Sequence, residues 1–193
     1  MVSLESLGMK KNWLYEIVVS SYSGQTANFA PFGVRTIDYK NIIIEMYKGS
    51  ATLKNILRLG EFAVNVVDDP IIFYNALYCM KKMHFSSAKM ITAPVVVDSP
   101  ATIEVRLKET EEREKSYILK AEVLHIDFRQ KSQLTNRAKS LALESLILST
   151  RKTLFPEKEM ERMLRENYRV VKKVAPESEY EKMMHDLLTD CLK

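Results

Sequence analysis

The hydrophobic pattern of this chain changes its period once, near residue 130, and that change limits the folds open to it. Before this point, apolar residues recur at every second position in several short segments, such as Trp13–Ser20 and Thr102–Lys108. Such alternation is typical of β-strands that bury one face. After this point, apolar residues recur at helical spacing. We therefore predict an α+β protein, with a β-domain at residues 1–130 and a helical C-terminal extension at residues 131–193.

Six segments of the first part have the composition and spacing of strands. They are residues 13–20, 27–37, 42–47, 62–67, 102–108 and 117–128. The second is expected to be broken or bent at Pro31 and Gly33, because proline cannot donate to a strand ladder. Short helices are expected at 50–59 and 70–77, and residues 81–100 are expected to be irregular. Six short antiparallel strands, with a charged hairpin loop at 109–115, can close into a small barrel.

The extension is predicted to contain three helices. The first, at 135–153, is apolar nearly all round, so it should be buried on more than one side. The second follows Pro156 and is expected at 157–168, and the third begins at Ser178–Glu181, which has the pattern of a helix-capping box. The extension must therefore pack on the barrel, on itself or on a second subunit.

Composition excludes several classes of protein. The chain has no run of about 18 uncharged apolar residues, so we predict no membrane-spanning helix. The first residues lack the apolar segment of a signal peptide, and we expect a cytoplasmic protein. The net charge of +4 is spread over both parts of the chain, whereas a nucleic-acid-binding surface needs clustered positive charge. We therefore expect neither a nucleic acid nor a membrane as partner.

Metal and acid–base chemistry also find little support in the sequence. The three histidines, His84, His125 and His185, are far apart and lack metal-ligand spacing. His125 is expected to be structural, and the two cysteines, Cys79 and Cys191, are expected to be buried thiols. No nucleophile-elbow motif is present. Because the chain has only five glycines and no glycine-rich loop, side chains and helix-start amides must hold any phosphate.

The segment from Lys48 to Thr52 is the best candidate for holding a phosphate. Gly49 lets the backbone approach an oxyanion, and Ser50 and Thr52 can offer hydroxyl and amide groups where a helix begins. Lys48 could add a cation. Plain helix capping requires the same serine and threonine, and it stays as the alternative.

A second candidate segment lies at residues 28–33. Asn28, Ala30, Pro31 and Gly33 would shape a pocket wall, where a proline in a strand frees backbone groups for the edge of a heteroaromatic ring. An edge-strand bulge would give the same pattern. Asn65, in an otherwise apolar strand, either faces a ligand or is a satisfied polar residue of the sheet.

Three spaced segments together resemble the FMN-binding split-barrel superfamily, on its flavin-reductase-like side. They are Asn28-x-Ala30-Pro31-x-Gly33, Ser50-x-Thr52-x-x-Asn55-Ile56 and Phe62-x-Val64-Asn65-Val66-x-Asp68-Asp69-Pro70-x-x-Phe73. The segment Asn136-Arg137-Ala138 and the residues that follow it resemble the helical C-terminal extension of one branch of that superfamily. The resemblance covers residues 13–155.

The resemblance implies a split barrel that forms a homodimer, with FMN bound at the subunit interface. It implies that the FMN phosphate contacts Ser50 and Thr52, with neighbouring groups nearby, and that the isoalloxazine ring lies along the strand that begins near Asn28. Arg137 and Arg151 of the extension are further candidates. The implied cofactor-binding residues are Asn28, Phe29, Ala30, Pro31, Lys48, Ser50, Ala51, Thr52, Asn55 and Arg137.

The implied activity is that of an NAD(P)H-dependent flavin or FMN oxidoreductase. Such an enzyme needs no strong protein acid or base, because the flavin carries the hydride. No nicotinamide-binding motif is matched in this chain, and no catalytic residue is assigned. Two alternatives stay open. One is a non-catalytic flavin-binding module that acts as a sensor or carrier, and the other is a nucleic-acid or protein adaptor built on residues 162–173.

Overall fold

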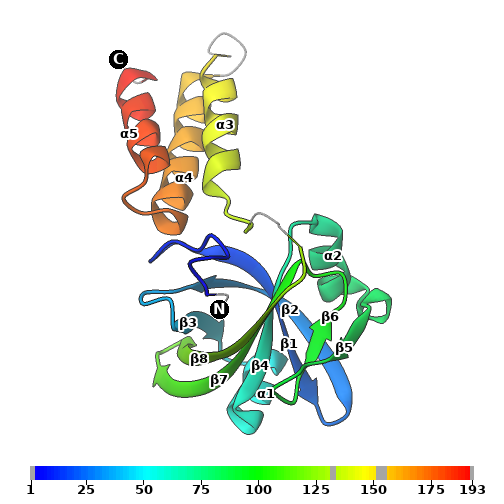
Figure 1. Cartoon of the computed structure of the whole chain (residues 1–193). Coiled ribbons are helices and arrows are strands. Elements are labelled where there is room, and N and C mark those ends of the chain that lie inside the picture. The colour runs from blue at the N-terminus through cyan, green and yellow to red at the C-terminus, as the bar shows by residue number, and fades with distance from the viewer. Residues whose placement is uncertain (1–2, 131–133, 151–155, 192–193) are drawn as a thin grey trace. The chain divides into compact units, whose positions relative to one another are not determined.

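A computed structural model describes residues 3–130, 134–150 and 156–191. The chain divides into two compact units. One comprises residues 1–11 and 15–135, and the other comprises residues 12–14 and 136–193. Figure 1 shows the first as a barrel of strands with short helices and the second as a group of helices.

The first unit is built around a closed antiparallel barrel with strand order β1-β2-β3-β8-β7-β4 (Figure 1). The strands are β1 (Tyr15–Ser23), β2 (Thr26–Arg35), β3 (Asn41–Tyr47), β4 (Glu61–Val66), β7 (Ala101–Glu112) and β8 (Ser116–Phe128). The register places Ile17, Val34, Ile44 and Val64 on the inner face, where all are fully buried. The predicted α+β class and six-stranded antiparallel barrel are thus confirmed.

Strand β2 pairs with β1 without interruption through Pro31 and Gly33, so the expected break is wrong. Because Pro31 has no amide proton but is paired with β1 in register, we infer that its backbone points away from β1. On that other side, β2 pairs with β3 only at Val34 and Arg35. The proline therefore costs no ladder hydrogen bond, because the edge of β2 from Thr26 to Gly33 has no partner strand in the described part of the chain.

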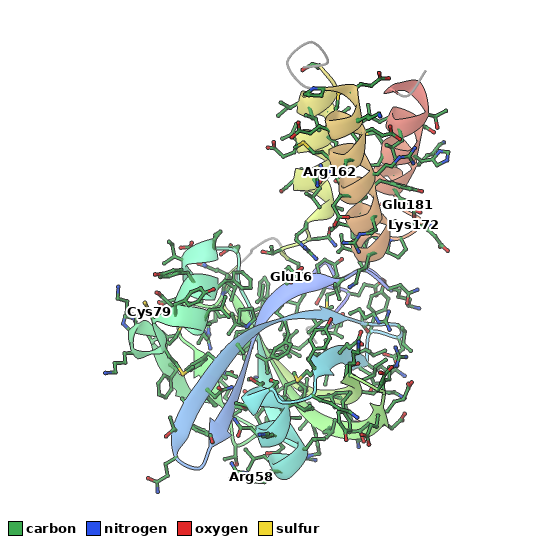
Figure 2. The ribbon with its side chains drawn as sticks, turned by 180° about the vertical axis from the view of Figure 1, so that it is seen from behind. Glu16, Arg58, Cys79, Arg162, Lys172 and Glu181 are labelled. Carbon is green, nitrogen blue, oxygen red and sulfur yellow. The ribbon has the colours of Figure 1, made fainter. Side chains whose placement is uncertain are left out.

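Two helices of the barrel unit begin and end where local sequence signals indicate. Helix α1 (Ala51–Leu59) begins after Ser50 and stops at Gly60, which has φ 72° in the left-handed region that favours glycine. Arg58 lies in the last turn of α1 (Figure 2). It donates to the Tyr22 carbonyl at 3.2 Å. Helix α2 (Pro70–Tyr78) begins after Asp69, whose carboxylate accepts a 2.8 Å bond from the Ile71 amide.

Residues 81–100 are more regular than the sequence suggests. A short 3₁₀ helix, η1 (Met80–Lys82), precedes a two-stranded sheet of β5 (Phe85–Ser87) and β6 (Pro94–Val96). Strands of three residues are too short to show a period. The expected loop at 109–115 is also too long, since β7 continues to Glu112 and its charged residues pair with β8. One example is the 2.9 Å ion pair between Lys120 and Glu109.

The second unit contains α3 (Ala138–Ser149), α4 (Glu157–Val174) and α5 (Glu179–Cys191). These helices pack on one another and on Trp13 and Leu14, with Met184 and Val171 fully buried. The capping box is present, because the Glu181 amide donates to the Ser178 hydroxyl at 3.1 Å. The Glu181 carboxylate accepts from the amide of Glu177 rather than of Ser178, at 2.7 Å. Helix α4 is six residues longer than predicted because its apolar stripe continues to Val174.

Candidate functional site

The two candidate segments of the barrel unit meet at the start of α1. The Asn28 side-chain amide, on β2, donates to the Thr52 hydroxyl at 2.9 Å. One turn later, the Asn55 side-chain amide donates to the Ser21 hydroxyl on β1 at 3.2 Å. Thr52 and Asn55 are 2% and 5% exposed, so these bonds fix the first turn of α1 against the barrel. Residues far apart in the sequence are thereby joined into one site.

The turn that enters α1 has the properties of an anion-binding site. Ser50 caps the helix by accepting from the Leu53 amide at 3.4 Å, and Gly49, at φ 92°, forms the left-handed turn before it. In the described residues, the amides of Ala51 and Thr52 have no hydrogen-bond acceptor. The first turn of α1 carries no acidic residue. Two amides and the positive end of the helix dipole can therefore interact with an anion there.

Hydroxyl groups add to this donor set. The Thr52 oxygen accepts the Asn28 bond, so its own proton can be donated to another oxygen atom. The Ser50 oxygen likewise accepts from Leu53 and keeps a proton to donate. One helical turn thus carries two hydroxyl and two amide donors, of which those of Ser50 and Ala51 are accessible and those of Thr52 are buried.

Lys48 lies beside this turn but already has a partner. Its ammonium group is 2.5 Å from the Glu112 carboxylate and lies over the Tyr117 ring. The hydrogen bond from Lys48 holds the pKa of Glu112 below its usual value, and the hydrogen bond to Glu112 raises the pKa of Tyr117. A phosphate at the turn would therefore be neutralised mainly by amides, hydroxyls and the helix dipole.

The second candidate segment offers backbone groups rather than side chains. Phe29 is buried, and it packs against Val18, Val67 and Ala76 on the outer face of the sheet. In an antiparallel pair, the backbone groups of alternate residues point toward and away from the partner strand. Phe29 and Gly33 are two residues from Pro31 on either side, so their backbone groups also point away from β1, toward the open edge of β2. That edge presents amide donors and carbonyl acceptors to whatever lies beside it.

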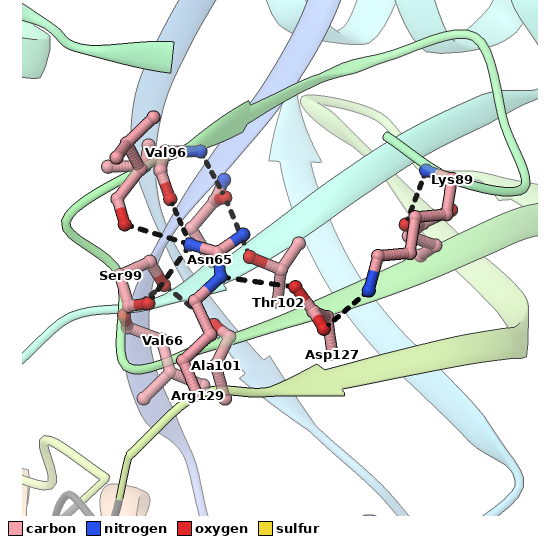
Figure 3. A network of polar contacts seen from close by, with 11 residues as sticks. Asn65, Val66, Lys89, Val96, Ser99, Ala101, Thr102, Asp127 and Arg129 are labelled. Carbon is pink, nitrogen blue, oxygen red and sulfur yellow. Dashed lines mark hydrogen bonds and ion pairs between the residues drawn. The ribbon is translucent and has the colours of Figure 1, made fainter. Parts of the chain in front are cut away.

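Asn65 is a satisfied polar residue of the sheet, because its side-chain amide group is bonded within the protein (Figure 3). Its side-chain amide donates to the Val18 carbonyl at 2.9 Å and to the Ser20 hydroxyl at 2.8 Å. Its side-chain oxygen accepts from the Val96 amide at 2.9 Å. Asn65 is fully buried and fastens β6 to the barrel.

A polar network that the sequence did not reveal holds the segment before β7 in place. Arg129 donates through one nitrogen to the carbonyls of Val96, Val97 and Ser99, and through another to the Asp127 carboxylate at 3.1 Å (Figure 3). Asp127 also accepts from the Lys89 ammonium at 2.8 Å, and this bond is the main cause of its lowered pKa. Apart from the neighbours Asp127 and Arg129, the partners are 30 to 38 residues apart in the sequence, so no local motif shows them.

The remaining candidate groups have structural surroundings or lie in the other unit. Asp69 caps α2, and Cys79, expected to be buried, is half-buried and free. His125 lies opposite Glu104, and no partner of its buried Nε2 atom is found in the described residues. Arg137 precedes α3 in the helical unit, whereas the other candidates all belong to the barrel unit. Arg151 lies outside the described residues.

Within the part of the chain that the structure describes, no group of three or more histidine, cysteine, aspartate or glutamate side chains could hold a metal ion. None of the described helices is both long enough and apolar enough to cross a membrane.

Comparison with protein families identifies the chain. Residues 15–130 match the N-terminal domain of the protein of unknown function DUF447, and residues 136–189 match the companion DUF447 model. The chain belongs to the DUF447 family. The two matched segments correspond to the barrel and to the helical extension, in that order.

Several solved structures share this fold. An FMN-bound protein of the DUF447 family from Methanosarcina mazei has 22% identity and a TM-score of 0.57, with 97% of this chain and 99% of that one covered. Flavoredoxin from Methanosarcina acetivorans has 18% identity and a TM-score of 0.53 over 62% of this chain and 71% of its own. The NADH:FAD oxidoreductase from Streptomyces globisporus has 14% identity and a TM-score of 0.53 over 61% and 77%. The resemblance to the flavin-reductase-like split barrels is thus confirmed at the level of the fold.

Proposed function

We propose that this protein binds FMN as a homodimer and acts as an NAD(P)H-dependent flavin or FMN oxidoreductase. One observation carries the proposal. The Asn28–Thr52 hydrogen bond joins a donor-rich helix start to a strand with an open backbone edge. A phosphate suits the first and a heteroaromatic ring suits the second, and FMN carries both groups on one ribityl chain. The FMN-bound family member from Methanosarcina mazei supports the same assignment.

In this proposal the phosphate binds to the turn at the start of α1. The amides of Ala51 and Thr52 and the hydroxyls of Ser50 and Thr52 donate to the phosphate oxygens. Asn55 contributes indirectly, because its bond to Ser21 holds the helix start against β1. Lys48, paired with Glu112, lies at the rim, and Arg137 is the candidate supplied by the helical unit.

The isoalloxazine ring lies along β2 in this proposal. The strand presents the backbone of Phe29 and the carbonyl of Pro31 to the ring edge, while Asn28 and Ala30 line the adjacent inner face. A second subunit would cover the open edge and exclude water from the ring. Bound FMN would supply the hydride chemistry, and the protein's part is to bind and orient it.

The proposal is tested with the purified full-length protein. Native mass spectrometry reports bound FMN and subunit number together, and titration with FMN measures affinity through quenching of flavin fluorescence. We expect a dimer that binds FMN and oxidises NADH or NADPH when an electron acceptor is present. A protein that does not bind added FMN would refute the flavin assignment. Binding without oxidation of either nicotinamide would instead make the protein a non-catalytic flavin-binding module.

A further inference from the structure

Helix α2 is apolar on both of its faces. One face, with Ile72, Phe73 and Ala76, packs into the cluster that contains Phe29 on β2. The opposite face is exposed and carries four large apolar or aromatic side chains: Ile71 at 61%, Tyr74 at 53%, Leu77 at 57% and Tyr78 at 73% exposed. The helix contains no charged residue. A surface helix normally turns a polar face to water.

These four residues, here called the α2 face, form a continuous surface. Ile71, Tyr74 and Tyr78 follow one another at helical spacing, and Leu77 lies beside Tyr74. The rings of Tyr74 and Tyr78 contact each other, with centroids 5.3 Å apart. Met80, just after the helix, extends the surface and is 40% exposed. Contiguous exposed apolar surface of this kind marks an interaction site.

The charges at the two ends of α2 indicate what covers this face. Asp69 stands at the start of the helix, while Lys81 and Lys82 follow its end, and all three are exposed. If two copies of α2 lie antiparallel about a two-fold axis, the acidic end of each meets the basic end of the other. Parallel packing would place like charges together. The face is therefore self-complementary only in the antiparallel arrangement.

We propose that the α2 face is the surface on which two copies of this chain associate, with the two α2 helices antiparallel about a two-fold axis. Tyr74, near the middle of the nine-residue helix, would then lie close to its own counterpart. This inference rests on the homodimer of the proposed function. It adds that the helix packed against Phe29 makes the contact, so association would brace the strand assigned to the flavin ring.

The first test compares two substitutions of equally exposed leucines in the full-length protein. Leu77 on α2 and Leu143 on α3 are both 57% exposed, so a glutamate should be tolerated in either folded monomer. We expect Leu77→Glu to raise the dimer dissociation constant at least tenfold in sedimentation equilibrium, while Leu143→Glu leaves it unchanged. A dimer that is equally stable with Leu77→Glu would overturn the proposal.

The second test examines the two-fold axis by cross-linking. In a Cys79→Ser, Cys191→Ser background, Tyr74→Cys should form a disulfide-linked dimer rapidly when oxygen and a copper catalyst are added. Leu143→Cys, on α3, is the control, since Leu143 is 57% exposed but belongs to the helical unit. Equal cross-linking of the two variants, or none with Tyr74→Cys, would exclude a two-fold axis at α2.

The third test addresses the antiparallel orientation. Lys81→Glu combined with Lys82→Glu would oppose Asp69 of the partner subunit with like charge, and we expect about threefold weaker association at low salt, as for exposed charge pairs. The loss should shrink as salt screens the charges. Stronger association of this variant would contradict the orientation. All three tests measure mass or cross-linking without flavin, so failure here is distinguishable from failure of the FMN assignment.

Discussion

Replacing Ser50 by aspartate separates helix capping from phosphate binding at the same position. Aspartate caps a helix about as well as serine does, and its charge interacts favourably with the N-terminal end of the helix dipole. The free protein should therefore keep its stability. The carboxylate would, however, occupy the place of the Ser50 hydroxyl, next to the unpaired amides of Ala51 and Thr52 in the described structure. A phosphate bound there would meet a negative charge in place of a hydrogen-bond donor.

The size of the effect follows from two contributions. Loss of a hydrogen bond to a charged group costs about 1.5 kcal/mol or more. Repulsion between two charges about 4 Å apart is about 1 kcal/mol in water and about 4 kcal/mol near a protein surface, and Ser50, being partly exposed, lies between these limits. We therefore expect FMN affinity to fall by about 2.5 to 5.5 kcal/mol, or roughly 60- to 8,000-fold.

The assay is titration of Ser50→Asp and wild-type protein with FMN and with riboflavin, which lacks the phosphate. Ser178→Asp, at the start of α5, makes the same chemical change at another helix cap and should leave both affinities unchanged. Thermal unfolding of each protein without flavin checks that the cap is intact. If Ser50→Asp weakens riboflavin as much as FMN, or weakens neither, the phosphate does not bind at this turn.

Three further predictions concern stability. Asn65→Ala should lower the free energy of unfolding, measured by urea titration, by about 2 to 4 kcal/mol. The substitution leaves the buried Val96 amide and Ser20 hydroxyl without this partner. A loss below about 0.5 kcal/mol would contradict the role of Asn65 in fastening β6. Asp127→Asn should lower the free energy of unfolding most above about pH 5. The pKa of Asp127 is lower in the folded protein than in the unfolded chain, so the ionised carboxylate stabilises the fold. This stabilisation is complete above the pKa of the unfolded state and is lost as pH falls through the pKa of the folded state. The urea midpoints of Asp127→Asn and of the wild type should therefore approach each other toward about pH 3. A difference between the midpoints that does not change with pH would refute the stabilising role of the Asp127 carboxylate. Gly60→Ala should cost about 1 kcal/mol in thermal unfolding, because Gly60 has φ 72°, whereas an unchanged melting temperature would argue against the left-handed cap.

What the sequence predicts well here is local. Ser50 and Gly60 mark the ends of α1 because capping depends on residues within one turn of the helix. The long strands are predictable because alternation is a property of the strand itself. The β5–β6 pair is not predictable from the sequence. Its position depends on hydrogen bonds of Asn65, Glu104 and Arg129 to partners that lie far away in the sequence.

The candidate site shows the same division. Its residue types were predictable from three spaced segments, but the Asn28–Thr52 contact depends on how α1 packs on the barrel. Lys48 illustrates the limit, since nothing near it in sequence indicates that Glu112, 64 residues later, is its partner. The open edge of β2 was also hidden, because a proline indicates a missing donor but not the side of the strand on which it is missing.

Strand β2 connects the parts of the proposed mechanism, because its side chains and its backbone edge contact different parts of the proposed site. The Phe29 side chain belongs to the cluster under α2, while its backbone faces the open edge assigned to the flavin ring. Substituting Phe29 would therefore act through the position of the strand rather than through direct contact with the ring. Asn28, next to it, points to the inner face and holds Thr52 at the phosphate turn. Adjacent residues of one strand thus connect the proposed dimer surface, the ring and the phosphate, because successive side chains of a strand point to opposite faces.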